Sequence, residues 1–333
     1  MRRGDVVPPA QQPSGIGSKI TPVPVYSLGR SLAFPPPDHA EDGLLAVGGD
    51  LSPARLLLAY RTGIFPWYDE ALPILWHSPD PRCVLAIERL HVGRTLRRVI
   101  AKRTYDVRFD GEFERVIRAC KATPRAGQDG TWITDDMERA YVRLHRMGYA
   151  HSIEAWQGQE LVGGLYGVSL GRIFFGESMF SWQPNASKVA LVVLAERIAQ
   201  WGFRVIDAQV PMPHTVAMGA EEWPRAKFLE VLREELRYPT RKGSWAAAEP
   251  ELEPPMPTMS PSREEHTRRE WRHRGERRPH HASWAFACCS MSTSASSPMN
   301  QCRSTRTHTL RTSRAEGMRE TTRRCGAQSS CAG

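Results

Sequence analysis

Three polar residues in the middle of the chain have the types and spacing that catalysis or ligand binding requires. Glu177 follows the apolar run of residues 173–175, and Asp207 and Gln209 follow the apolar residues 205–206. Alternate residues of a strand point to the same face, so Asp207 and Gln209 are expected to look into one space, with Ala208 turned away. Such polar groups in an apolar cleft describe a ligand site, and they describe a structural hydrogen-bond network equally well.

The segment that must position these residues, 174–209, is predicted to form a strand, a turn, a helix and a second strand. The helix starts near residues 185–187 and ends at Gly202, since glycine is favoured directly after a helix. Apolar residues surround most of this helix, which predicts that the rest of a domain buries it. Residues 151–180 precede it and are typical of an antiparallel meander of three strands.

Helix signals dominate the region before the meander. Ser52 is expected to cap a helix that has Pro53 at its first position and Gly63 at its end. Thr134 is expected to cap a later helix that Gly148 ends. The Thr134 helix, the meander, the buried helix and the last strand together predict an α+β second domain.

Basic residues recur at three- and four-residue spacing near residue 100. A helix would align them on one side, as a phosphate backbone requires, although a solvated helix face is the more common origin of such spacing. The four residues are Arg94, Arg97, Arg98 and Lys102.

The composition of the 333 residues changes near residue 240. Residues 241–333 contain no Val or Ile. They hold 16 basic residues (Lys and Arg) and 9 acidic residues (Asp and Glu), whereas residues 1–240 hold 29 basic and 27 acidic residues. A segment so poor in apolar residues cannot bury a core, which predicts disorder. We therefore predict a flexible lead (1–24), a small N-terminal α/β domain (25–90), a catalytic domain (91–240) and a disordered basic tail (241–333).

Other composition signals exclude several classes of protein. The cysteine spacings match no zinc pattern, and Cys83 and Cys120 are the only cysteines before residue 241, so we expect no metal and a cytoplasmic location. No stretch approaches about 18 uninterrupted apolar residues, so no membrane partner is expected. P-loop, GxGxxG and HExxH motifs are absent.

Nine motifs between about Tyr26 and Leu236 resemble the leucyl/phenylalanyl-tRNA–protein transferase family. They are GGDLSPARLLLAYRTGIFPW, LWHSPDPR, GTWIT, HSIEAW, ELVGGLYGV, FFGESMFS, ASKVAL, IDAQ and PHTVAMGA, in that order. The resemblance implies transfer of leucine or phenylalanine, less well methionine, from aminoacyl-tRNA to proteins with N-terminal Arg or Lys, which marks them for degradation. It also implies a second domain with a mixed sheet like that of the GCN5-related acetyltransferases. An aminoacyl ester is already activated, so we expect no cofactor, and we expect a monomer.

By motif position, the resemblance assigns roles to individual residues. Asp207 and Gln209 resemble the pair at the transfer step, and Glu177 the third polar residue. Trp67 and Trp132 resemble the aromatics that hold the terminal adenosine, and the basic stripe becomes a tRNA contact. The donor side-chain pocket would be lined by Leu165, Phe174, Met179 and Ile206. ESMFS is followed by Trp182, where the family usually has arginine.

Two other functions compete with this interpretation. An acyl-CoA-dependent acetyltransferase would need a glycine-rich pyrophosphate loop before the helix that starts near residues 185–187, but SWQPNASKVAL has no glycine. A non-catalytic tRNA- or RNA-binding protein would rely on the basic tail, and Glu177, Asp207 and Gln209 argue against it.

Overall fold

The computed structural model describes residues 25–124, 131–247, 250–255 and 271. A small sheet and the first helix lie near the start of the chain. Helix α1 (Pro53–Arg61) has both predicted ends: Ser52 Oγ accepts a hydrogen bond from the Arg55 N–H, and Gly63 has a φ of 77°. The sheet has the order β1-β2-β4-β3. Its strands are β1 (Tyr26–Leu28), β2 (Leu44–Gly48), β3 (Phe65–Pro66) and β4 (Leu75–His77).

The larger sheet has seven strands in the order β11-β5-β10-β9-β8-β7-β6. The predicted meander is confirmed as the antiparallel strands β7, β8 and β9. Strand β10 runs parallel to β9 and antiparallel to β5, so the sheet is mixed. The strands are β5 (Arg82–Ala86), β6 (Asp106–Phe109), β7 (Ala150–Gln157), β8 (Glu160–Leu170), β9 (Ile173–Ser181), β10 (Val205–Gln209) and β11 (Glu221–Trp223).

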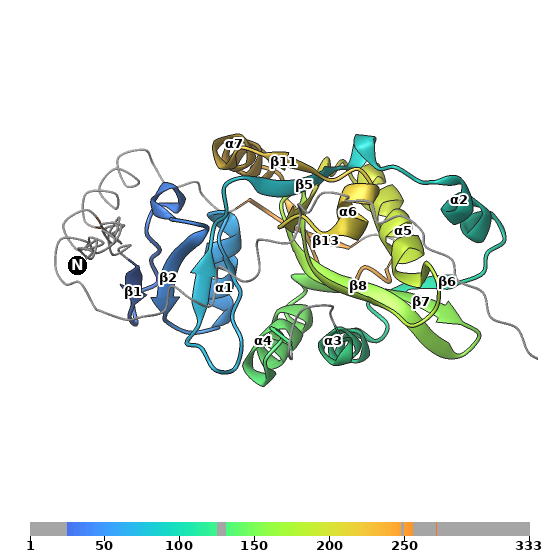
Figure 1. Ribbon diagram of the computed structural model, residues 1–333, viewed down its shortest axis with the longest axis horizontal. Helices are drawn as coiled ribbons and strands as arrows, with labels where there is room; N and C mark the ends of the chain where they lie inside the picture. Colours follow the sequence, from blue (N-terminus) through green and yellow to red (C-terminus); the bar gives the residue numbers. More distant parts are fainter. Residues whose placement is uncertain (1–24, 125–130, 248–249, 256–270, 272–333) are drawn as a thin grey trace, which may run out of the picture. The chain divides into compact units, whose positions relative to one another are not determined.

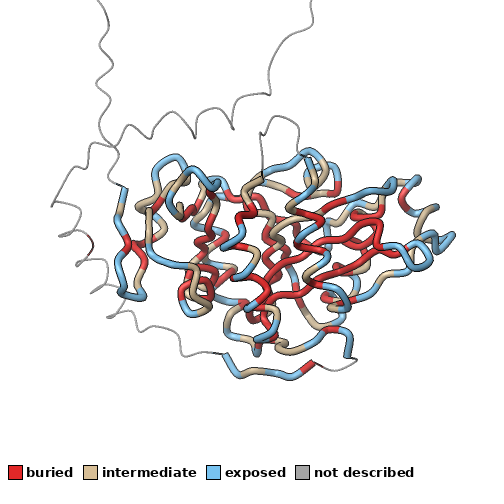
Figure 2. Tube along the Cα trace, turned by 90° about the horizontal axis from the view of Figure 1, so that it is seen from below, coloured by how far each residue is buried: buried red, intermediate tan, exposed pale blue. Residues whose placement is uncertain are grey.

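Helices cover both faces of this sheet, as Figure 1 shows. Helices α3 (Phe113–Ala122) and α4 (Asp135–Arg146) lie on one face, and α5 (Ala186–Gln200) lies on the other. Burial is concentrated in the strands between them (Figure 2). No helix in the described part of the chain is long and apolar enough to cross a membrane. The remaining helices are α2 (Arg94–Ala101), α6 (Pro213–Ala217) and α7 (Arg225–Glu235).

The strand–helix–strand unit predicted for residues 174–209 is present as β9, α5 and β10. Helix α5 is buried along most of its length, and Gly202 follows it with a φ of 82°. Thr134 Oγ1 accepts a hydrogen bond from the Met137 N–H at the start of α4, and Gly148 beyond its end has a φ of 82°. These results confirm a mixed α/β architecture.

Strand β5 lies within residues 25–90, which were assigned to the N-terminal domain, yet it pairs with β10 and β11 of the larger sheet. The change from one sheet to the other therefore falls between His77 and Arg82 rather than at residue 90. The sequence did not show this, because β5 is an apolar strand like any other until its partners are known.

The prediction of disorder from residue 241 is wrong for the first residues of that segment. Strand β12 (Thr240–Lys242) pairs with β13 (Glu251–Glu253), and Trp245 is fully buried. Trp245 stacks on His151 with ring centroids 3.9 Å apart, and the backbone N–H of Trp245 donates to Asp110 Oδ2. Burial of one large aromatic side chain thus holds this segment, which lacks Val and Ile, against His151 and Asp110. Residues 256–270 and 272–333 of the predicted tail lie outside the described residues, as does the predicted lead.

Candidate active site

Glu177 lies at a bulge in β9. Tyr166 of β8 is opposite Ser178 and Gly167 is opposite Gly176, so Glu177 is an extra residue without a partner in the register. A Cβ atom at Gly167 would lie 2.2 Å from the Phe175 carbonyl oxygen, which explains the glycine. Bulges redirect side chains and are common beside active sites. The strand irregularity therefore sets the direction of the Glu177 carboxylate.

Three donors converge on that carboxylate. Tyr60 of α1 donates to Glu177 Oε1 at 2.7 Å, and Tyr141 of α4 donates to Oε2 at 2.8 Å. Gln209 Nε2 donates to Oε1 at 3.1 Å. The two tyrosine hydroxyls also contact each other. Glu177 thus joins the first helix, the α4 helix and the end of β10.

Burial raises the pKa of Glu177 to about 7. The hydrogen bonds from Tyr60 and Tyr141 oppose this shift because they favour the charged carboxylate, whereas the negative charge of Asp207 adds to it. Burial also raises the pKa of both tyrosines well above the usual value, so they remain hydrogen-bond donors. A carboxyl group with a pKa near neutrality can exchange a proton under physiological conditions.

Asp207 is fully buried and forms an ion pair with Arg82. Arg82 Nε donates to Oδ1 at 2.8 Å and Nη2 donates to Oδ2 at 2.6 Å, a bidentate arrangement. Oδ1 also accepts the Gln209 N–H at 3.0 Å. Arg82 therefore already neutralises the charge of Asp207.

The alternation argument for Asp207 and Gln209 is wrong, although the two residues do come together. Ala208 is an extra residue opposite β5, and Gln209 has a φ of 58°, so regular alternation ends at Asp207. The Val210 N–H bonds to the Ala208 carbonyl oxygen at 2.6 Å, which closes a γ-turn around Gln209. This turn, rather than a shared strand face, directs Gln209 toward Glu177.

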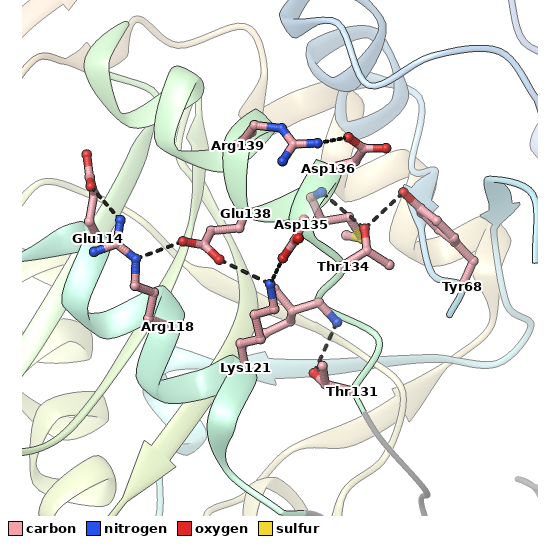
Figure 3. Close-up of polar contacts among 12 residues, drawn as sticks. Tyr68, Glu114, Arg118, Lys121, Thr131, Thr134, Asp135, Asp136, Glu138 and Arg139 are labelled. Carbon is pink, nitrogen blue, oxygen red and sulfur yellow. Dashed lines mark hydrogen bonds and ion pairs between the residues drawn. The ribbon is translucent and has the colours of Figure 1, made fainter. Parts of the chain in front are cut away.

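The two tryptophans expected to hold an adenosine lie on neighbouring loops. Both are partly buried and pack against the same core cluster. Tyr68, next to Trp67, has its hydroxyl 3.4 Å from Thr134 Oγ1, two residues after Trp132. Figure 3 shows this contact beside the ion pairs that join α3 to α4, including those of Lys121. The Trp67 and Trp132 loops are therefore held to each other.

The four residues predicted to line the donor pocket belong to one apolar cluster. Leu165 of β8 is opposite Met179 of β9, and Ile206 of β10 is opposite Phe174. Leu165, Phe174 and Ile206 are buried, while Met179 is partly exposed. The structure thus brings these four residues together on adjacent strands.

The basic stripe lies on α2 and its C-terminal cap. Leu96 is buried on the inner side of the helix. The structure shows no ion pair for the stripe within the described residues, so these charges face solvent. The exposed residues are Arg94, Arg97, Arg98 and Lys102.

Sequence reasoning missed Arg82, Tyr60 and Tyr141. Arg82 ends the LWHSPDPR motif, and Tyr60 lies in the motif GGDLSPARLLLAYRTGIFPW, within α1. A buried carboxylate needs a cation or hydrogen-bond donors, so partners of this kind could be expected. No local sequence pattern identifies which residues supply them. In the described part of the chain, no three His, Cys, Asp or Glu side chains are grouped so that they could hold a metal ion.

Comparison with known proteins gives consistent results. Residues 84–233 match the family model for leucyl/phenylalanyl-tRNA protein transferase, and residues 49–80 match the model for its N-terminal domain. The transferase of Myxococcus xanthus is 57% identical over 234 residues, which cover 68% of this chain and 100% of that protein. The transferase of Anaeromyxobacter sp. (strain Fw109-5) is 59% identical over 222 residues, 66% of this chain and 94% of that protein.

Similarity to solved structures is low. A functionally unknown conserved protein from Staphylococcus epidermidis has a TM-score of 0.32 and 9% identity, over 54% of this chain and 68% of its own. That value supports no statement about fold or function. The sequence relatives are decisive: the chain belongs to the leucyl/phenylalanyl-tRNA–protein transferase family and is an aminoacyltransferase.

Proposed function

We propose that this enzyme transfers leucine or phenylalanine, and methionine less efficiently, from aminoacyl-tRNA to the α-amino group of proteins that begin with Arg or Lys, marking them for degradation. The observation that carries the proposal is the meeting of Glu177 and Gln209 at irregular positions of neighbouring parallel strands. The apolar cluster around Phe174 lies on the same strands. Family membership supplies the reaction class, and the cluster supplies groups suited to it.

The chemistry requires little activation of the donor. An aminoacyl ester is already reactive, so the enzyme must hold a neutral amine in line with the ester carbonyl carbon. A free α-amine has a pKa of about 7.7–8.0. The amine nitrogen forms the new C–N bond, the ester C–O bond breaks, and the leaving ribose oxygen gains a proton.

The polar cluster divides this work among its members. Gln209 orients the attacking amine, and Asp207 fixes Gln209 through its backbone N–H. Glu177, with a pKa of about 7, accepts the amine proton. In an alternative route, the amine proton passes through the ribose hydroxyl to the leaving ribose oxygen, and no proton is gained or lost overall.

The choice of acceptor follows from charge. The structure shows Asp207 paired with Arg82, and it shows no cation paired with Glu177 among the described residues. Glu177 is therefore the carboxylate that would attract an N-terminal Arg or Lys side chain. Neutral N-terminal residues would lack this attraction.

The donor is recognised at three places. The apolar cluster of Leu165, Phe174, Met179 and Ile206 accepts an apolar side chain that is not branched at Cβ, such as that of leucine, phenylalanine or methionine, with discrimination of about 1–3 kcal/mol per methylene. Trp67 and Trp132 stack on the terminal adenosine, which contributes about 1–3 kcal/mol for any tRNA. The α2 stripe contacts the phosphate backbone. We place these functions in a domain like that of the GCN5-related acetyltransferases, acting in the cytoplasm where aminoacyl-tRNA is made.

Transfer of labelled phenylalanine from Phe-tRNA to a peptide tests the proposal. A peptide beginning with Arg should be labelled, and the same peptide beginning with Ala should not. Glu177→Gln and Gln209→Ala should each lower kcat at least about 100-fold, while Glu160→Gln, an exposed carboxylate on β8, should have no effect. Binding of tRNA without transfer would instead favour the non-catalytic RNA-binding protein.

A further inference from the structure

The Arg82 side chain contacts both halves of the proposed site. It is 1% exposed and holds both oxygens of Asp207. Its remaining nitrogen, Nη1, donates to the Gly63 carbonyl oxygen at 3.2 Å. One guanidinium group therefore joins β10 to the segment directly after α1.

The surroundings of Arg82 leave the guanidinium little freedom. Its Cζ atom lies 4.7 Å from the ring centroid of Phe65 in β3 and 4.7 Å from that of Phe228 in α7. Its backbone is held from the other side, because Arg82 begins β5 and is opposite Trp223 of β11. The group is thus oriented before any substrate binds.

Each partner of Arg82 leads to a residue of the site. Asp207 Oδ1, which accepts from Arg82 Nε, also accepts the Gln209 N–H and so fixes the γ-turn. Gly63 lies three residues after Tyr60, whose hydroxyl donates to Glu177. A shift of the guanidinium would therefore be transmitted to Gln209 and to the donor of Glu177.

We propose that Arg82 is a positioning residue for the transfer step, acting through Asp207 to hold Gln209 in its left-handed conformation. This inference rests on the proposed function. Arginine is required because three directed donors in one plane reach two carboxylate oxygens and one carbonyl oxygen. Lysine carries the charge but cannot supply that fork.

A double-mutant cycle tests the coupling. The variants are Arg82→Met, Asp207→Asn and the two combined, with Arg82→Lys as the conservative change. Arg225→Lys is the matched control, since Arg225 is a largely buried arginine that donates to the Ser78 carbonyl oxygen at 2.6 Å. The assay measures kcat and KM for Phe-tRNA with an Arg peptide, and urea unfolding verifies the fold of each variant.

We expect Arg82→Met and Asp207→Asn each to lower kcat about 100-fold with KM changed less than about twofold. The kcat of the combined variant should be no lower than that of the less active single variant, because both changes break the same chain of contacts. It should also fold, since replacing a buried ion pair by neutral groups of similar size is often tolerated. Arg82→Lys should recover part of the activity, and Arg225→Lys should match the wild type.

Reductions in kcat that multiply to about 10⁴-fold would mean that Arg82 acts independently of Asp207 and would overturn the inference. Wild-type kcat in a folded Arg82→Met protein, or a change in KM alone, would overturn it as well. These results would leave the proposed function standing, provided that Gln209→Ala remains inactive. Absence of transfer by the wild type would remove both proposals together.

Discussion

Gln209 Nε2 lies 3.1 Å from Glu177 Oε1, and each residue stands where its strand departs from regular pairing. Glu177 is the extra residue of β9, and Gln209 follows the extra residue of β10. Strands β9 and β10 are parallel neighbours, so their two irregular positions come close where β10 ends beside the middle of β9. The contact depends on both irregularities.

The left-handed conformation of Gln209 predicts an unusual ranking of variants. Gln209→Gly should be about 1 kcal/mol more stable than Gln209→Ala, because a φ of 58° strains any residue with a Cβ atom. Both variants should be equally inactive, since both lack the amide. Urea unfolding gives the stabilities. At the exposed helical position Glu196 the order should be reversed, and a Gly variant of Gln209 no more stable than the Ala variant would contradict the expectation.

Removal of the tyrosine hydroxyls should change the pH dependence of transfer. The hydrogen bonds from Tyr60 and Tyr141 lower the pKa of Glu177, so Tyr60→Phe or Tyr141→Phe should raise it further above about 7. If the carboxylate accepts the proton, the acidic limb of the kcat profile should move about one unit to higher pH. Tyr105→Phe, whose hydroxyl donates to the Pro184 carbonyl oxygen, should leave the profile unchanged. An unshifted limb in both variants would exclude Glu177 as the titrating group.

Glu177 should also make the stability of the protein depend on pH. Its pKa is raised from 4.5 to about 7 in the folded protein, so the folded state binds more protons than the unfolded state between these values. Its contribution is therefore fully present below about pH 4.5 and is lost as the pH rises through about 7. Relative to Glu177→Gln, the wild type should lose stability between about pH 5 and pH 8. A Glu160→Gln protein should follow the wild type, and a constant difference between wild type and Glu177→Gln would refute the raised pKa.

Charge reversal on α2 should weaken tRNA binding without affecting the chemical step. Arg97→Glu combined with Arg98→Glu should raise the KM for Phe-tRNA about tenfold or more at low salt, with kcat at saturation retained. The slope of log affinity against log salt should fall by about one for each phosphate that is no longer bound. Exposed Arg143 and Arg233 provide the matched double reversal. An equal effect in that control would assign the result to net charge rather than to the stripe.

Trp245 should be essential for stability despite its place in a segment of low apolar content. Trp245→Ala should lower the free energy of unfolding by about 3–5 kcal/mol, because a fully buried ring is removed. Trp182→Ala should change it by less than about 1 kcal/mol, since that side chain is 58% exposed. Chemical denaturation of both variants provides the comparison. Similar small decreases would restore the prediction of a disordered segment from residue 241.

The sequence by itself determined the features that depend on neighbouring residues. Ser52 and Thr134 cap helices because a side-chain oxygen reaches an N–H three residues later. Gly202 ends α5 because glycine adopts a positive φ without strain. The apolar runs identified β9, α5 and β10, and the motifs identified the family and the identity of Glu177, Asp207 and Gln209 as candidate residues.

Only the tertiary structure decided how those residues are held. Arg82 is separated from Asp207 by 125 residues, and Tyr60 from Glu177 by 117. Side-chain hydrogen bonds between distant segments leave no local pattern in a sequence. A bulge is likewise a property of two paired strands, so neither the extra residue in β9 nor that in β10 follows from either strand alone. The same reason explains Trp245, whose burial depends on a site formed by His151 and Asp110, which lie far earlier in the chain.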